Sequence, residues 1–288
     1  MNAPSLITSE TLMSLPDARV FEASWFMGDN RERSQGYEHY ATSHIAGAVF
    51  FDIDKVAERT STLPHMLPSV EDFRLWAVDV GIEQDDQIVV YDRHPSLMSA
   101  PRAWWVLRCF GYDKVAVLDG GFNAWLEKGG KVEKGEGNTT FASRKQGAFV
   151  ASVSDQRARY CASLEDVRAA SRAGAPQIID ARSEGRFDGR EQEPRAGLAS
   201  GHIPSSRNVP YASVCDDKGH LLTNESLRQL FASRGVDVDK PAVTSCGSGI
   251  TACVLAFALH QLGNQQVRVY DGSWTEWGTE WGTERGTP

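Results

Sequence analysis

One cysteine is followed by a run of small residues that could expose its sulfur to a reactant. The chain here reads Ala242-Val-Thr-Ser-Cys246-Gly-Ser-Gly-Ile-Thr251, which suggests a short strand, a tight loop and the start of a helix. Gly247 and Gly249 permit backbone angles that other residues resist, so successive main-chain N–H groups could converge on one point. The positive end of the following helix would strengthen that field. We therefore expect Cys246 to be held as a thiolate, the nucleophilic form.

A buried cysteine at the end of a core strand is the alternative interpretation, because cysteine is among the most buried residue types. Two glycines beside a core cysteine would have no packing purpose, which favours a reactive sulfur. The apolar run over residues 252–263 is long enough for about three helical turns and ends at a glycine, a common helix terminator.

Four arginines lie in one charged stretch of the second half and could bind an anionic substrate. They are Arg182, Arg186, Arg190 and Arg195. A guanidinium binds a carboxylate through two parallel hydrogen bonds, and such a group near a thiolate would also help to keep the sulfur ionised. Four acidic residues accompany the arginines, so a solvated charged loop is the competing interpretation.

Composition narrows the class of protein. The 288 residues suggest two domains, and the net charge of −8 makes nucleic acid and anionic membranes poor partners. Five cysteines without a Cys-x-x-Cys pair indicate free thiols in a reducing compartment and no metal site. The N-terminus has no basic and apolar leader pattern, and no apolar run is long enough to span a bilayer. We expect a cytoplasmic protein without a cofactor.

The two halves of the chain resemble each other. Residues 69–92 align without a gap with residues 223–246, and residues 118–125 match residues 270–277. A repeat of about half the chain indicates a domain duplication. We expect an N-terminal domain over residues 1–135 that lacks the catalytic cysteine, a linker over 136–158, and a C-terminal catalytic domain over 159–288.

Each half alternates short apolar strands with helical segments, which predicts an α/β fold with a mainly parallel sheet. The expected strands are 20–21, 88–91 and 115–118 in the first half, and 178–179, 242–245 and 267–270 in the second. The expected helices before the central strands are 70–80 and 225–234, with Ser69 and Thr223 as N-caps. Between the opening strand and a recurring His-Ile turn, we expect a long loop.

The repeat is informative where it fails. Cys246 aligns with Asp92, and the loop after Asp92 contains Pro95 where the second half has glycine. The first half is therefore expected to lack both the nucleophile and the converging amides. His44 and His202 recur in both halves, although only one half is reactive, which favours a structural role. His65 considered alone is expected to be a surface or packed histidine.

Short motifs over nearly the whole chain point to a known family. They are Phe51-Asp-Ile-Asp54, His65-Met-Leu-Pro68, Ser99-Ala-Pro-Arg102, Leu118-Asp-Gly-Gly121, Gly185-Arg-Phe187, Glu193-Pro-Arg195, Gly201-His-Ile-Pro204 and Tyr270-Asp-Gly-Ser273. Together with the duplication and the cysteine loop, they resemble the rhodanese superfamily, and within it the branch that takes sulfur from 3-mercaptopyruvate. The resemblance implies two tandem rhodanese-like domains.

The resemblance also implies a reaction. Cys246 would take sulfur from 3-mercaptopyruvate as a persulfide and release pyruvate, and a thiol such as thioredoxin, or cyanide, would collect the sulfur. Asp54, His65 and Ser248 match a set assigned in the family to proton handling, and Arg186 and Arg195 match its carboxylate-binding arginines. The loop residues that would surround the substrate sulfur are Gly247, Gly249, Ile250 and Thr251.

Three other functions would also use a cysteine in such a loop. Thiosulfate-specific relatives carry arginine and lysine directly after the cysteine, where this chain has neutral Gly247 and Ser248. A cysteine-dependent phosphatase needs arginine six residues after its nucleophile, where this chain has Ala252. A sulfur carrier or redox-sensing module would use Cys246 without turnover. The arginine pair and His65 favour a dedicated small-molecule site instead, and turnover with mercaptopyruvate that is lost in Cys246→Ser would separate the two.

Overall fold

The computed structural model describes residues 4–30, 32, 34–141 and 153–280, which separate into two compact units. The first unit contains the described residues of Met1–Thr60, Leu67–Arg157 and Asp217–His220. The second contains Ser61–Met66, Ala158–Asp216 and the described part of Leu221–Pro288. Each unit thus includes a short segment from the other half of the sequence. Part of the linker predicted at 136–158 lies outside the described residues, and the predicted boundaries stay a prediction.

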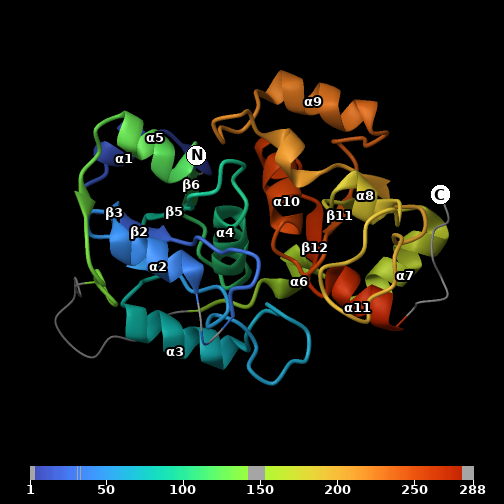
Figure 1. The fold of residues 1–288 in the computed structure, drawn as a ribbon, viewed down its shortest axis with the longest axis horizontal. Coiled ribbons are helices and arrows are strands. Elements are labelled where there is room, and N and C mark those ends of the chain that lie inside the picture. Colours follow the sequence, from blue (N-terminus) through green and yellow to red (C-terminus); the bar gives the residue numbers. More distant parts are fainter. Residues whose placement is uncertain (1–3, 31, 33, 142–152, 281–288) are drawn as a thin grey trace. The chain divides into compact units, whose positions relative to one another are not determined.

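The first unit is built on a five-stranded parallel sheet (Figure 1). Its strands, in spatial order, are β1 (Leu6–Ile7), β6 (Val115–Leu118), β5 (Ile88–Tyr91), β2 (Arg19–Glu22) and β4 (Val49–Phe50). The central strand β5 is buried along its whole length, as expected for a parallel sheet covered on both faces. A separate antiparallel pair joins β3 (His44–Ile45) to β7 (Val132–Glu133).

The second unit repeats this architecture. Its strands, in spatial order, are β8 (Cys161–Ala162), β12 (Val267–Tyr270), β11 (Ala242–Ser245), β9 (Gln177–Asp180) and β10 (Arg207–Asn208). All neighbouring pairs are parallel, and each strand has a counterpart at the same place in the first sheet. The identical strand order confirms the α/β class and agrees with the duplication read from the sequence.

Helices accompany both sheets (Figure 1). In the first unit they are α1 (Ser9–Met13), α2 (Gln35–Thr42), α3 (Val70–Val80), α4 (Ala100–Cys109) and α5 (Gly121–Glu127). The second half of the chain contributes α7 (Leu164–Ala173), α8 (Glu184–Phe187), the 3-10 helix η1 (Tyr211–Val214), α9 (Asn224–Ser233), α10 (Ala252–Gln261) and α11 (Ser273–Glu280), and α6 (Arg157–Tyr160) precedes them. No helix among the described residues is both long and apolar enough to cross a membrane.

Most predicted elements form where the sequence places them. The central strands and α3 have the predicted bounds, and α9 and α10 differ from the prediction only at their ends. The hydroxyls of Ser69 and Thr223 cap α3 and α9, accepting hydrogen bonds from Asp72 N and Ser226 N. The long loop expected before the first His-Ile turn is wrong, because α2 forms there with Ser34 as its N-cap.

The paired histidines have the structural role that their recurrence indicated. His44 is fully buried, stacks on Tyr40 with ring centroids 4.0 Å apart, and binds the Tyr40 carbonyl through Nδ1. His202 stacks on Phe187 at the same separation and binds the Phe187 carbonyl through Nδ1. In each case the imidazole ring connects the His-Ile turn to the preceding helix.

Candidate active site

Cys246 lies where a central strand ends and a helix is about to begin. It directly follows β11, whose Ser245 pairs in register with Asp180 at the end of β9. Ligands of open α/β sheets bind outside the carboxyl ends of the strands, and Cys246 is at that edge. The residue is 2% exposed, but the sulfur has polar neighbours. Its Sγ accepts the N–H of Gly249 at 3.1 Å and lies 3.9 Å from the Ser273 hydroxyl.

The first turn of α11 sets the direction of the cysteine loop. The N–H of Trp274 donates to the carbonyl of Cys246 at 2.9 Å. Thr275 binds the carbonyl of Gly247 twice, through its N–H at 2.9 Å and its hydroxyl at 2.7 Å. In a trans peptide the N–H points away from the C=O. Because these carbonyls point at α11, the N–H groups of Gly247 and Ser248 point away from it.

The remaining loop residues complete a short turn into α10. Gly249 has a φ of +82°, a conformation that a side chain would strain, and this directs its N–H at the sulfur. Its carbonyl accepts the Cys253 thiol at 3.2 Å. Ile250 is buried, and Thr251 is the N-cap residue of α10. The structure therefore brings the predicted loop residues together around Cys246.

Arg186 lies beside this loop. It belongs to α8, and its Nη2 would be 2.8 Å from a Cβ added at Gly247, so glycine leaves the space that the guanidinium occupies. Glu193 holds the group through Oε1 to Nε at 3.2 Å and Oε2 to Nη2 at 2.6 Å. The Arg186 side chain is 19% exposed, which leaves it partly open to a ligand.

The other arginines of the charged stretch differ from one another. Arg182 is buried and binds Asp180 and Glu193, so it fixes Glu193 rather than meeting solvent. Burial disfavours its charge, but these two carboxylates outweigh that effect and raise the pKa of Arg182. Arg190 is exposed and pairs with Asp188. The solvated-loop interpretation therefore holds for Arg190 and fails for Arg182 and Arg186.

Arg195 meets His65, a residue from the first half of the sequence. Arg195 Nη2 lies 3.4 Å from His65 Nε2, and both belong to the second unit because Ser61–Met66 packs there. His65 is 5% exposed and has a φ of +62°, which is unusual for a residue with a side chain. Such conformations persist where the surroundings enforce them, often at functional sites.

Asp54 belongs to the first unit. Its Oδ2 accepts the indole N–H of Trp25 at 3.0 Å, and its main-chain N–H donates to Asp52. Both contacts lie within the first unit. The part assigned to Asp54 in proton handling stays a prediction.

Comparison with known proteins identifies the family. The model of the rhodanese-like domain matches residues 15–128 and again residues 163–280. The chain belongs to the rhodanese family. It is 41% identical over 263 residues to the 3-mercaptopyruvate sulfurtransferase of Escherichia coli K12, covering 91% of this chain and 90% of the relative. It is 39% identical over 297 residues to the mitochondrial thiosulfate/3-mercaptopyruvate sulfurtransferase 1 of Arabidopsis thaliana, covering 96% and 78%.

A solved structure agrees with both the fold and the duplication. The crystal structure of SseA from Escherichia coli, described as a 3-mercaptopyruvate sulfotransferase with the rhodanese fold, superposes with a TM-score of 0.79. It is 37% identical to this chain, and the match covers 94% of this chain and 99% of SseA. The two-domain rhodanese architecture expected from the sequence motifs is confirmed.

The first rhodanese-like domain fills the position of the reactive sulfur with a carboxylate. Asp92 Oδ2 accepts the N–H groups of Ser99 and Ala100, each at 2.7 Å, and Oδ1 accepts the N–H of His94 at 3.1 Å. The expectation that this half lacks converging amides is therefore wrong. The amides are present and bind a side chain of the same domain, so a substrate anion would have to displace Asp92.

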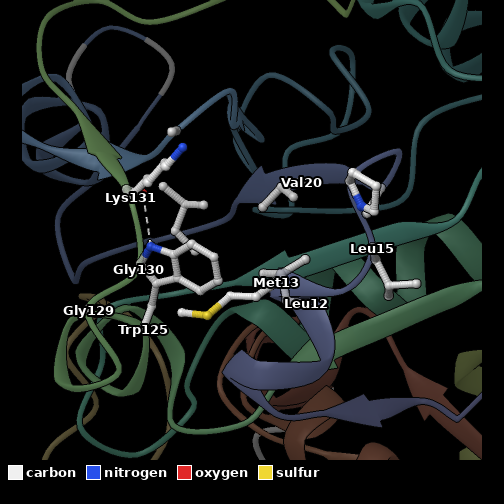
Figure 2. A pocket seen from close by; sticks show the side chains of 12 residues that line it. Leu12, Met13, Leu15, Val20, Trp125, Gly129, Gly130 and Lys131 are labelled. Atoms are coloured by element: carbon white, nitrogen blue, oxygen red, sulfur yellow. Dashed lines mark hydrogen bonds between the residues drawn. The ribbon is translucent and has the colours of Figure 1, made fainter.

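A separate cavity of about 440 Å³ opens in the first rhodanese-like domain. Figure 2 shows Leu12, Met13, Leu15, Val20 and Trp125 along it, with the indole N–H of Trp125 bonded to the Lys131 carbonyl. Lys131 is the one charged residue of this lining, and neither cysteine nor histidine contributes. These walls offer no nucleophile, so the candidate active site remains at Cys246.

No metal site accompanies the cysteine loop. All five cysteines are free thiols, and no group of three or more His, Cys, Asp or Glu side chains within the described residues could hold an ion.

Sequence reasoning missed the residues that support the site. Glu193 was named only inside the Glu193-Pro-Arg195 motif and was given no role, whereas it orients Arg186. Ser273 appeared only inside a motif, although the repeat held a signal, because Gly121 stands at the matching position of the first half. A difference between two copies at one turn indicates that one copy needs a side chain there.

Proposed function

We propose that the protein is a 3-mercaptopyruvate sulfurtransferase that carries the transferred sulfur as a persulfide of Cys246. One observation above all supports this: Cys246 Sγ receives the Gly249 N–H in a loop that also lies against the guanidinium of Arg186. Main-chain donors stabilise an anionic sulfur, and a guanidinium suits a carboxylate. The site thereby combines a nucleophile with a binding group for the carboxylate of an α-keto acid that carries a thiol.

In the first step the Cys246 thiolate attacks the sulfur of 3-mercaptopyruvate. A sulfur–sulfur bond forms, and the bond between that sulfur and C3 breaks. The electron pair of the broken bond moves to C3 and gives the enolate of pyruvate, which takes one proton to become pyruvate. Cys246 is left with one additional sulfur. Main-chain N–H groups of residues 247–251 stabilise the sulfur anion before attack and the persulfide after it.

In the second step an acceptor removes the outer sulfur. A thiolate of a thioredoxin-like protein attacks it and forms its own persulfide, and the electron pair of the broken bond regenerates the Cys246 thiolate. Cyanide attacking the same atom gives thiocyanate. The five free cysteines support a reducing location, and we assign the protein to the cytoplasm.

Two arginines bind the donor in this proposal. Arg186 and Arg195 hold the carboxylate, and Glu193 keeps Arg186 in the required orientation through two hydrogen bonds. His65, with Asp54 and Ser248, supplies the proton that the enolate takes. Its contact with Arg195 at 3.4 Å supports a place near the bound carboxylate.

Neutral residues directly after the cysteine favour mercaptopyruvate over thiosulfate. Gly247 and Ser248 provide no positive charge to bind the thiosulfate dianion. The choice between the two donors therefore depends on the arginines that bind a carboxylate. We expect kcat/KM for mercaptopyruvate to exceed that for thiosulfate by roughly ten- to hundredfold, the effect of losing one charge-assisted contact.

The test assays the purified protein with both donors and with dithiothreitol or cyanide as acceptor. Cys246→Ser should abolish turnover, and mass spectrometry after exposure to donor without acceptor should find one added sulfur at Cys246. Cys215→Ser, in the same unit, is the control and should retain activity. A preference for thiosulfate would overturn the donor assignment, whereas a sulfur gained without turnover would indicate a carrier.

A further inference from the structure

Ser273 has a backbone conformation that its residue type resists. It is fully buried, and its φ is +50°, in the left-handed region that favours glycine. The matching residue of the first domain is Gly121, with a φ of +54°. The turn between the last strand and the following helix thus has the same shape in both domains. Glycine would be the unstrained choice, so the serine side chain must contribute something that offsets the strain.

The side chain of Ser273 reaches the reactive cysteine. Its Oγ accepts the main-chain N–H of Cys246 at 3.0 Å and donates to the carbonyl of Tyr270 at 2.8 Å. The same Oγ lies 3.9 Å from Cys246 Sγ. In the first domain, position 121 has no side chain and position 92 has no sulfur, so serine and cysteine occur in the same copy of the repeat.

The hydroxyl has one hydrogen and two acceptors within reach. With a neutral thiol the shorter contact, to the Tyr270 carbonyl, holds the hydrogen. An anionic sulfur is a stronger acceptor, because hydrogen bonds to charged groups are shorter and stronger than neutral ones. Rotation about the Cβ–Oγ bond redirects the hydrogen while the oxygen keeps its bond from Cys246 N–H.

We propose that Ser273 is a positioning residue for sulfur transfer, which holds the Cys246 main chain and donates a hydrogen bond to its sulfur when that sulfur is charged. The inference rests on the proposed function for the charged states concerned, which are the attacking thiolate and the thiolate released when the acceptor removes the outer sulfur. It adds a side-chain donor to the main-chain donors of the loop, and it explains why this turn alone carries a strained serine beside the cysteine.

The test compares Ser273→Gly, which relieves the strain, with Ser273→Ala, which keeps it; neither retains the hydroxyl. The pH dependence of Cys246 alkylation by iodoacetamide is followed by peptide mass spectrometry, which separates Cys246 from the other cysteines. Both variants should move this pH profile to higher pH by about one unit, because the anionic sulfur loses one hydrogen-bond donor. Each should also lower kcat/KM for mercaptopyruvate about tenfold.

Ser205→Gly is the matched control, because Ser205 also has a positive φ, +65°, but is exposed and bonds only the Ser171 carbonyl in the contacts described. It should leave the alkylation profile unchanged. An unmoved profile in both Ser273 variants would overturn the proposal, and so would a shift in only one of them, because the hydroxyl is missing from both. Alkylation needs no sulfur donor, so absence of mercaptopyruvate turnover in the wild type would refute the proposed function separately.

Discussion

At the scale of single residues, the site depends on one carboxylate that forms ion pairs with two arginines. Glu193 binds Arg182 and Arg186, and its side chain is only 2% exposed. Arg182 is closed in by Asp180, whereas Arg186 extends to the loop of Cys246. A buried carboxylate needs such partners to remain charged. Arg182 therefore stabilises the acid, and the acid aims Arg186.

Truncating Arg186 to alanine should weaken substrate binding. The lost pair between guanidinium and carboxylate contributes about 1.5–3 kcal/mol, which corresponds to a KM for mercaptopyruvate raised roughly ten- to hundredfold. Steady-state kinetics measure this effect. Arg190→Ala is the control, because Arg190 is exposed and forms an ion pair with Asp188; its KM should match the wild type. An unchanged KM in Arg186→Ala would remove this residue from the site.

His65 should act on the rate rather than on binding. His65→Ala is expected to lower kcat by about a hundredfold or more, the usual contribution of a group that transfers a proton. Circular dichroism should remain that of the wild type, because one side chain in a short segment is changed. The control is His39→Ala on the exposed face of α2, for which kcat should not change. Normal turnover by His65→Ala would return this residue to the packed histidine first expected.

At the scale of elements, the strands could be predicted because each is a short apolar run rich in β-branched residues between turn signals. The helix α2 was missed altogether and a loop was expected in its place, because Ser34 and Gln35 precede only a weakly apolar face. The cap of α7 is more complete than that of α3: Ser163 binds Asp166 N, and the Asp166 carboxylate binds back to Ser163 N. Local sequence therefore predicted the central apolar strands with their bounds, and it failed for a helix whose apolar face is weak.

The cap of α7 should give the stability a defined pH dependence. The Ser163 main-chain N–H, the hydroxyl of Ser163 and the nearby Arg268 lower the pKa of Asp166 from its ordinary value of 3.8. A lowered folded-state pKa adds stability above pH 3.8 that is lost as pH falls through the folded-state value. Ser163→Ala should therefore cost about 1 kcal/mol of unfolding free energy at pH 7, and less below pH 3.

Urea unfolding at several pH values measures this difference. Ser233→Ala at the exposed end of α9 is the control, because its hydroxyl bonds the Leu230 carbonyl within its own helix and does not cap it. Its effect should be small and independent of pH. If the Ser163→Ala effect were the same at pH 3 and pH 7, the Ser163 hydroxyl would have no part in lowering the pKa of Asp166.

At the scale of the whole molecule, the sequence revealed the duplication but not the exchange of segments. Ser61–Met66 packs in the second unit, and Asp217–His220 packs in the first, where His220 binds Asp119 at 3.0 Å. Both segments precede the helix that leads to a central strand. No local pattern indicates such long-range packing, because periodicity reports only neighbours within one element. This is why His65 could be linked to the second half only through a family resemblance.

The two copies of the loop have different roles after the duplication. Substitutions of Asp92 and Cys246, which stand at the same position of the two copies, test this difference. Asp92 is buried and accepts three main-chain N–H groups, so Asp92→Ala leaves buried donors unpaired at about 1–3 kcal/mol each. Amide hydrogen exchange should rise in peptides covering β5 and α4 and stay unchanged in those covering β11 and α10. The KM for mercaptopyruvate should not change.

Cys246→Ser should give the opposite result, with no turnover and unchanged exchange throughout, because a serine oxygen can accept the Gly249 N–H that the sulfur accepts. Hydrogen exchange suits this comparison, because it resolves the two units separately where a single melting temperature would not. If Asp92→Ala changed KM while exchange in β5 stayed the same, the first copy of the loop would take part in binding the donor. The Asp92 carboxylate would then have a role in substrate binding and not in the stability of its domain.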